Sequence, residues 1–315
     1  MMKRITFVFI AFILLTACNS KKAGQETTTG DSFSFVFMTD IHLKPELKAA
    51  EGFRTAIRRV NALKPDFVIT GGDLIDDALA ASYGRADSLY TLYKELSEEF
   101  QMPVYNAMGN HDIFGYSSLP KVSRDHPEFG ERMFEKRIGK RYYSFDHKGW
   151  HFIVMDGIEE GDGTWGSYIG MVDQEQLDWI REDLENIDDE TPVIISTHIP
   201  LVSIRPQINN GPLYAENHSA LVINSTDVLA PFRHKNLKLV LQGHLHFLEE
   251  LNMLNRVRFI TGGAVCGSWW RTPDDAVLQE GFVLVKVKDG DFSWEYIDYG
   301  WETGIVSGRP VNETE

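Results

Sequence analysis

Five short apolar runs along the chain each end in side chains that can bind a metal ion. The runs end in the segments "MTDIH", "GGD", "GNHD", "STH" and "GHLH", which contribute Asp40 and His42, Asp73, Asn110 and His111, His198, and His244 and His246. In open α/β sheets, ligands bind beyond the carboxyl ends of the strands. We therefore expect these segments to converge on one edge of a sheet and to form a single site.

Each of these segments is ambiguous when it is taken alone, because Asn, Asp and Gly are also common turn formers. The spacing supports a site. Asp40 with His42, and His244 with His246, are two residues apart, so each pair points to the same side of an extended chain. The other histidines lie in no comparable setting and are predicted to be surface or packing residues: His126, His147, His151, His218 and His234.

The first third of the chain alternates between apolar runs and amphipathic patterns. Residues 46–64 carry Ala50, Phe53, Ile57 and Val60 at helical spacing, and Pro65 ends that pattern. A second helix is marked by apolar residues between 89 and 100. With strands predicted over 33–38, 66–70 and 103–107, the order is βαβαβ.

The middle of the chain predicts antiparallel pairing and the rest predicts mainly strands. The runs 141–147 and 150–156 are separated by only two residues, which indicates a hairpin. Asp173 and Gln176 have the spacing of a capping box at the start of a third helix. Continuous apolar runs after residue 190 are typical of strands covered on both faces. No linker follows residue 31, so we predict one domain over residues 32–300 and a C-terminal tail over 301–315.

The N-terminus is typical of an exported chain. A basic start, "MMKR", precedes an apolar stretch that is too short to span a bilayer. The "LTAC" that follows resembles a bacterial lipobox, which implies cleavage of the signal peptide 1–17 and acylation of Cys18. A plain secretory signal is the alternative. We expect a flexible tether over 18–31 and a lipoprotein anchored in a membrane, facing the periplasm or the cell exterior.

The net charge argues against nucleic-acid partners, and the cysteine content excludes an intrachain disulfide. After removal of residues 1–17, 46 acidic residues face 29 basic ones, which gives a formal net charge of −17. A nucleic-acid polymer requires a basic surface, so we exclude it as a partner. Cys266 is the only cysteine besides Cys18, so the mature chain cannot form an intrachain disulfide.

The segments "DIH", "GGDLIDD", "GNHD", "STHIP" and "GHLH", in this order, resemble the signature of the calcineurin-like metallophosphoesterases over about residues 33–265. The resemblance implies an α/β fold, a four-layer α/β/β/α sandwich with two mixed sheets. Asp76 stands where purple acid phosphatases have a tyrosine, which excludes that branch. The arrangement is most similar to the subgroup of bacterial cyclic-nucleotide and glycerophosphodiester phosphodiesterases.

The resemblance also implies which residues bind two metal ions. The implied ligands of the first ion are Asp40, His42, Asp73 and His246. The implied ligands of the second ion are Asp73, Asn110, His198 and His244, so that Asp73 bridges both. Imidazole and carboxylate ligands without thiolate suit Mn, Fe, Zn, Co or Ni and do not select among them. Two ions about 3.5 to 4 Å apart can clamp a phosphoryl group and make hydroxide available near neutral pH.

The remaining site residues have other implied roles. In the family, the histidine at the position of His111 is not a ligand but stabilises the transition state or protonates the leaving group. Asp112 is expected to fix the tautomer of His111. Trp269, Trp270 and Arg271 could offer a substrate an aromatic surface and a cation, although two packing tryptophans and a surface arginine are the alternative.

These observations predict a metal-dependent phosphoesterase that acts on a small extracytoplasmic phosphodiester. A phosphomonoesterase that uses the same site is the nearest alternative. A lipid-anchored protein that keeps the fold and only binds a metal or ligand is an alternative of a different class.

Overall fold

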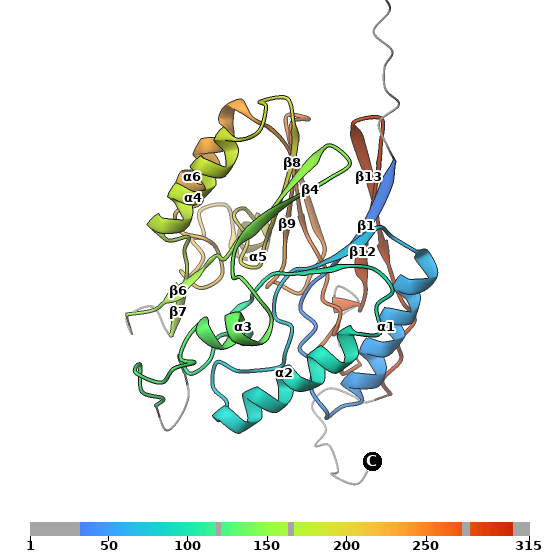
Figure 1. Ribbon diagram of the computed structural model, residues 1–315, viewed down its shortest axis with the longest axis vertical. Helices are drawn as coiled ribbons and strands as arrows, with labels where there is room; N and C mark the ends of the chain where they lie inside the picture. Colours follow the sequence, from blue (N-terminus) through green and yellow to red (C-terminus); the bar gives the residue numbers. More distant parts are fainter. Residues whose placement is uncertain (1–31, 118–120, 163–166, 273–277, 305–315) are drawn as a thin grey trace, which may run out of the picture.

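The computed structural model describes residues 32–117, 121–162, 167–272 and 278–304. Two β-sheets face each other and helices cover their outer sides (Figure 1). The strand order of the five-stranded sheet is β13 (Asp291–Ile297), β12 (Phe282–Lys288), β1 (Phe33–Met38), β2 (Phe67–Thr70) and β3 (Val104–Asn106). The signal peptide, Cys18, the tether and residues 305–315 of the predicted tail lie outside the described residues.

The second sheet has six strands. Their order is β10 (Glu249–Met253), β11 (Val257–Thr261), β9 (Asn236–Gln242), β8 (Pro192–Thr197), β5 (Trp150–Val154) and β4 (Tyr143–His147). A separate hairpin consists of β6 (Ile158–Glu160) and β7 (Tyr168–Gly170). β1, β2 and β3 are parallel in one sheet, and β5, β8, β9 and β11 are parallel in the other. The carboxyl ends of the central strands therefore share one edge in each sheet.

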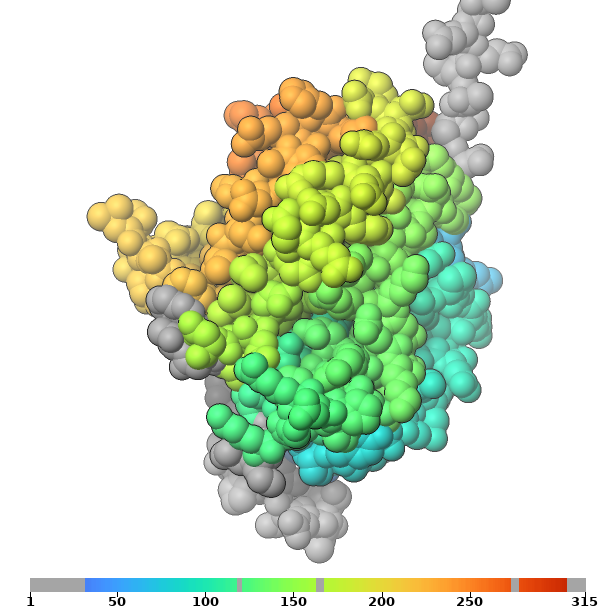
Figure 2. Space-filling model, turned by 60° about the vertical axis from the view of Figure 1, so that its left-hand side comes forward, coloured from blue at the N-terminus to red at the C-terminus, as the bar shows by residue number. Residues whose placement is uncertain are grey.

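Helices form the two outer layers. α1 (Ala49–Leu63) and α2 (Tyr83–Ser97) cover the first sheet, and α4 (Gln174–Glu185) and α6 (Ser225–Leu229) cover the second (Figure 1). The remaining helical turns are short: η1 (Asn110–Asp112), α3 (Arg132–Arg137), α5 (Arg205–Asn210) and η2 (Ala230–His234). The segment around α5, gold in Figure 2, projects from one side of the molecule. None of the described helices has the length and hydrophobicity needed to cross a membrane.

The core between the sheets follows the alternation of side chains along a strand. Phe33, Phe35 and Phe37 of β1 point into the space between the sheets, whereas Val36 and Met38 point outward beneath the helices. The ring of Phe35 stacks on Phe67 and meets Phe152 of the opposite sheet edge-on, with ring centroids 5.1 and 5.6 Å apart. Both faces of the strand are buried, which explains its continuous apolar run and confirms the predicted four-layer fold.

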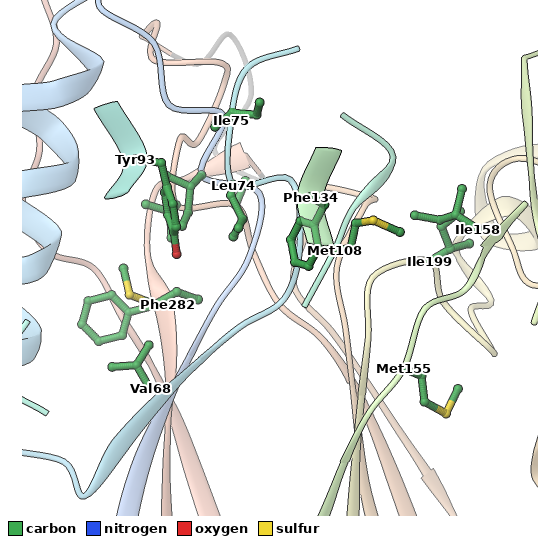
Figure 3. Packing of buried hydrophobic residues seen from close by; sticks show 14 of the residues in the cluster. Val68, Leu74, Ile75, Tyr93, Met108, Phe134, Met155, Ile158, Ile199 and Phe282 are labelled. Carbon is green, nitrogen blue, oxygen red and sulfur yellow. The ribbon is translucent and has the colours of Figure 1, made fainter. Parts of the chain in front are cut away.

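Residues beside the predicted ligands also anchor the loops in the core. Leu74 and Ile75 follow Asp73, and Met108 lies two residues before Asn110. All three apolar side chains are completely buried in the cluster beneath the helices (Figure 3). The loops after β2 and β3 are therefore fixed by packing as well as by their strands.

The helix boundaries differ from the predicted ones for local reasons. The helix predicted from residue 46 begins at Ala49, because Leu47 and Lys48 have left-handed φ angles of 58° and 56°. At α4 only half of the capping box forms. The Asp173 carboxylate accepts from the Gln176 backbone N–H at 2.6 Å, but the Gln176 side chain bonds the backbone of Asp156 instead. Trp301 packs against the core and Thr303 is 9% exposed, so the first residues of the predicted tail contact the domain.

His151 on β5 is a buried histidine held between two carboxylates. Its Nδ1 lies 2.7 Å from Asp146 Oδ1, and its Nε2 lies 2.8 Å from Asp183 Oδ2. Both ring nitrogens can donate only when the imidazole is charged. Burial alone would lower the pKa of His151, but the carboxylates of Asp183 and Asp146 raise it above its usual value. The charged imidazole therefore ties α4 to β4 and β5 of the second sheet.

Replacing His151 with Gln should destabilise the protein most at mildly acidic pH. We expect a loss of about 2 kcal/mol in unfolding free energy near pH 6, because a charged donor loses two carboxylate partners. The folded pKa is raised, so this stabilisation is complete below the unfolded pKa near 6.5 and disappears as the pH rises through the folded pKa. Urea unfolding of both proteins between pH 5.5 and 9 measures the difference, and the exposed His234→Gln serves as the control. A difference independent of pH would contradict the charged state.

Candidate metal centre

The structure brings all seven predicted metal ligands to one place. They follow the carboxyl ends of β1, β2, β3, β8 and β9, five strands drawn from both sheets. They form two groups that share Asp73. The first group is Asp40, His42, Asp73 and His246, and the second is Asp73, Asn110, His198 and His244. The site thus spans the edge where the two sheets meet.

The first group lies around the imidazoles of His42 and His246. Their Nε2 atoms are 3.0 Å apart. Asp40 Oδ1 lies 3.2 Å from His246 Nε2, and Asp73 Oδ2 lies 3.5 Å from His42 Nε2. Two imidazole nitrogens and two carboxylates thus converge on one small volume.

The second group lies on the other side of Asp73. His198 Nε2 is 3.2 Å from Asp73 Oδ2 and 3.1 Å from Asn110 Oδ1. Its Nδ1 donates to the carbonyl of Gly71 at 2.8 Å, so Nε2 is the nitrogen that faces the site. Ligand atoms of Asp73, His198 and His244 lie within 4.8 Å of one another. The same Asp73 oxygen therefore approaches histidines of both groups.

These residues fit divalent cations, and one atom in particular requires a partner. Asp40 Oδ2 accepts from the Thr39 hydroxyl at 2.6 Å and from the His244 backbone N–H at 3.0 Å. Asp40 Oδ1 is buried and has no hydrogen-bond partner. A buried charged oxygen is costly unless it is paired, and here it faces imidazole nitrogens that are themselves metal ligands elsewhere in proteins.

The backbone at the predicted ligands is unusual. Asp40, His42, Asp73, His244 and His246 all have left-handed φ angles, between 46° and 70°. Such angles are uncommon for residues other than glycine and cluster at functional sites. They turn the chain sharply after each strand, which directs successive side chains into the same volume.

Two glycines leave room for Asp73. Gly72 has a φ of +93°, a conformation that a side chain would strain. A Cβ atom at Gly109 would lie 2.2 Å from both the backbone N and Oδ1 of Asp73. The segments "GGD" and "GNHD" therefore depend on each other, because the glycine of one accommodates the carboxylate of the other.

The buried charges of the site balance one another. Burial raises the pKa of Asp73, but the imidazoles of His198 and His111 outweigh it and hold that pKa well below its usual range. Burial and the neighbouring His198 lower the pKa of His244 to about 4. Burial lowers the pKa of His198, but the Asp73 carboxylate outweighs it and raises that pKa to about 9. Asp73 and His244 are thus in the forms that bind metal ions, whereas His198 must release its Nε2 proton when an ion binds.

His111 is oriented by the backbone and not by Asp112, so that prediction was wrong. His111 Nδ1 lies 2.7 Å from the carbonyl oxygen of Asp76, and its backbone N–H donates to Asp73 Oδ1 at 2.8 Å. The Asp112 carboxylate instead accepts from the backbone N–H groups of Gly109, Leu74 and Ile75. Asp112 closes the short η1 turn, so its side chain points back toward the start of that turn and away from the imidazole.

Trp269 and Trp270 are adjacent but have different environments. The Trp269 ring lies against the rings of His42 and His246, with centroids 4.0 and 4.8 Å away, and its side chain stays 39% exposed. Trp270 is 1% exposed, and its Nε1 donates to the carbonyls of Ile41 and His42 at 3.0 Å each. Trp270 therefore presents no surface at the metal centre, which contradicts the predicted substrate contact and agrees with the packing alternative. It fixes the loop that carries His42.

Cys266 is a neighbour of the site that the sequence did not reveal. Its sulfur lies 4.0 Å from His246 Nδ1, and ligand atoms of Cys266, His42 and His246 lie within 4.8 Å of one another. The signal is weak, because Cys266 follows β11 by five residues without any other ligand-type side chain nearby. Only the parallel pairing of β11 with β9 brings it close to His246.

Comparisons with known proteins agree with this geometry. A probable cyclic nucleotide phosphodiesterase from a Synechococcus strain is 26% identical over 236 residues, which cover 70% of this chain and 77% of that protein. The 3′,5′-cyclic adenosine monophosphate phosphodiesterase CpdA of Haemophilus influenzae is 24% identical, and the match covers 68% of this chain and 69% of that protein. The crystal structure of a dimetal phosphatase from Danio rerio has the same fold, with a TM-score of 0.59 at 16% identity over 85% of this chain and 99% of that one.

The family model of the calcineurin-like phosphoesterases matches residues 33–248. This range includes every predicted metal ligand from Asp40 to His246. The chain therefore belongs to the calcineurin-like phosphoesterase family, whose members are metal-dependent phosphoesterases.

Proposed function

We propose that this protein hydrolyses a small phosphodiester outside the cytoplasm, with two metal ions bound at the edge where its two sheets meet. The observation that carries the proposal is the position of Asp73. One oxygen of its carboxylate lies 3.5 Å from His42 Nε2 and 3.2 Å from His198 Nε2, so a single side chain can serve two cations. When bound, such a pair of ions stabilises charge on the phosphoryl oxygens and supplies a nucleophile at neutral pH.

Other residues of the site donate hydrogen bonds, orient the metal ligands or cover the site. His111 Nδ1 donates to the Asp76 carbonyl, so Nε2 carries a proton only in the imidazolium form. In that form, Nε2–H can donate a proton to a leaving group or a hydrogen bond to a phosphoryl oxygen. Thr39 and the His244 backbone hold one oxygen of Asp40, which leaves the second oxygen aimed at the site. Trp269 covers one side of the histidine pair and provides an exposed aromatic face.

The names of the two relatives favour a diester over a monoester, since both are described as cyclic nucleotide phosphodiesterases. The exposed face of Trp269 supports the same substrate class, because a nucleobase can stack on an indole. Phosphomonoester hydrolysis by the same residues remains the alternative reaction. Metal or ligand binding without catalysis is the alternative of a different class.

A substrate panel tests the proposal directly. The purified protein is stripped with a chelator, reloaded separately with Mn²⁺, Fe²⁺, Zn²⁺ or Co²⁺, and assayed on cyclic nucleotides, glycerophosphodiesters, a chromogenic diester and matched monoesters. We expect no activity in the stripped protein and a higher kcat/KM for diesters in at least one reloaded form. A preference for monoesters would establish the phosphatase alternative. Tight metal binding without hydrolysis of any ester would favour the binding protein.

Removing the Trp269 ring should affect nucleotide substrates selectively. We expect Trp269→Ala to raise KM for a cyclic nucleotide about tenfold, because stacking of a base on an aromatic ring contributes about 1–3 kcal/mol. Hydrolysis of a glycerophosphodiester, which has no base, should change little. Trp269→Phe should restore most of the loss, and Trp179→Phe on α4 is the control. Equal losses on both substrates would mean that Trp269 supports the site and does not contact a base.

We further propose that the acylated Cys18 holds the enzyme on a membrane. The proposal is supported by the "LTAC" segment after a short apolar stretch with a basic start. We expect Cys18→Ser to release the protein from the membrane fraction or to block its maturation, as cell fractionation would show. The same variant should keep wild-type kcat/KM when purified. Normal processing with unchanged membrane retention would contradict the anchor.

A further inference from the structure

A cavity of about 430 Å³ lies next to the metal centre. Cys266 belongs to both places, because it lines the cavity and its sulfur lies 4.0 Å from His246 Nδ1. Trp301 contributes apolar surface to the cavity and the buried Trp270 lies behind it in the lining, whereas Trp269 and the seven predicted metal ligands are not part of the lining. The volume is in the range of sites that bind small molecules.

Three hydrogen-bond donors in the lining of this cavity have no partner among the described residues. They are Arg271 Nη1, Trp301 Nε1 and the hydroxyl of Thr303, and all three atoms are buried. Arg271 also forms no ion pair with any described residue. Buried donors are almost always satisfied in native proteins, and leaving them unpaired is costly. Because all three donors line one cavity, we expect a ligand there with a negatively charged group that accepts hydrogen bonds.

The same cavity also presents negative charge. Glu280 is half-buried in its lining and Glu302 is exposed at its edge. Glu280 and Glu302 line one cavity, so their carboxylates repel each other. Burial, with the charges of Asp298 and Glu302, raises the pKa of Glu280 accordingly. A cationic group between Glu280 and Glu302 would relieve that repulsion. A polyanion is disfavoured by the same two carboxylates.

We propose that this cavity is a second small-molecule site, which binds a zwitterion of the amino-acid class. Its carboxylate would accept from Arg271, Trp301 and Thr303. Its ammonium group would lie between Glu280 and Glu302, and an apolar side chain would pack on the partly buried indole of Trp301. The inference uses none of the predicted metal ligands, so it does not depend on the proposed phosphodiesterase activity.

The test uses the metal-loaded full chain and isothermal titration with the twenty amino acids. At least one with an apolar side chain should bind. Two probes with the same side chain test the two charges separately. The corresponding amine lacks the carboxylate, and the corresponding carboxylic acid lacks the ammonium group. We expect both probes to bind at least tenfold more weakly. Arg271→Gln and Glu280→Gln should each raise the dissociation constant of the amino acid about tenfold. The control Arg258→Gln on β11 should leave it unchanged.

A second measurement separates binding from folding. Thr303→Val replaces an unpaired buried hydroxyl with a methyl of similar shape, so the ligand-free protein should become more heat-stable while amino-acid affinity falls. A less stable variant would overturn the proposal, because it would show that the hydroxyl is already satisfied. Absence of binding by all twenty amino acids, or equally tight binding of the amine or the acid, would also overturn it. None of these outcomes bears on whether the enzyme hydrolyses phosphodiesters.

Discussion

Replacing Asp73 with Ala is expected to remove bound metal and phosphoester hydrolysis together. Asp73 Oδ2 approaches histidines of both ligand groups, so neither group keeps its shared anion in the variant. The Asp73 carboxylate also accepts from the His111 backbone N–H, so the η1 turn loses one of its hydrogen bonds to the loop after β2. We expect kcat/KM to fall on the order of 10⁴-fold or more, the scale seen when a residue that assembles a catalytic unit is removed.

The measurement pairs metal content with activity on the same samples. Elemental analysis should find fewer than two ions per chain in Asp73→Ala, and Asp73→Asn should lie between this variant and the wild type because it keeps one oxygen. Asp66→Asn is the matched control, since Asp66 lies directly before β2 and Asp73 lies beyond its other end. If Asp73→Ala still binds two ions per chain, Asp73 is not the bridge.

Replacing His111 with Ala should separate binding from chemistry. The imidazole is held by the Asp76 carbonyl and lies beside His42, with ring centroids 4.7 Å apart, so it is placed to act on a bound substrate. We expect both metal ions and a near-normal KM to remain, while kcat falls about 10² to 10⁴-fold, as for the loss of a general acid or a stabilising donor.

A series of leaving groups distinguishes the two roles of His111. The loss should shrink for very acidic leaving groups if His111 protonates the departing oxygen, and it should persist if His111 stabilises the phosphoryl oxygens. His147→Ala, far from the metal centre at the end of β4, is the control. Because ligand atoms of His42, Asp73 and His111 also lie within 4.8 Å of one another, loss of metal from His111→Ala would reassign it as a ligand.

Most of the fold and the grouping of the predicted ligands could be predicted from the sequence for one physical reason. A strand buried on both faces has a continuous apolar run, and the polar residues at its end are then conspicuous, as "FSFVFM" before Asp40 illustrates. The four-layer arrangement itself came from the resemblance to the family. Short elements such as α5 and α6 gave no signal, because five or six residues are too few to show a helical period.

The contacts of individual side chains could not be predicted, because they depend on turns and on pairings distant in sequence. Asp112 was expected beside His111, but the tight η1 turn directs it to the backbone of Gly109. Trp270 and Trp269 looked equivalent in the sequence, and only the hydrogen bonds of Trp270 to the loop after β1 place it in the core. Cys266 approaches His246 only because their strands are neighbours.

Five residues of the metal site have a left-handed backbone that lowers stability while it positions their side chains: Asp40, His42, Asp73, His244 and His246. Glycine adopts such angles without strain, whereas each of these residues carries a cost of about 1–2 kcal/mol. A laboratory selection that rewarded survival at high temperature alone would therefore tend to replace these residues with glycine and discard the enzyme's chemistry. Variants that are more heat-stable and still active should carry their stabilising substitutions at other positions. The five residues should be retained only when the selection also requires catalytic activity.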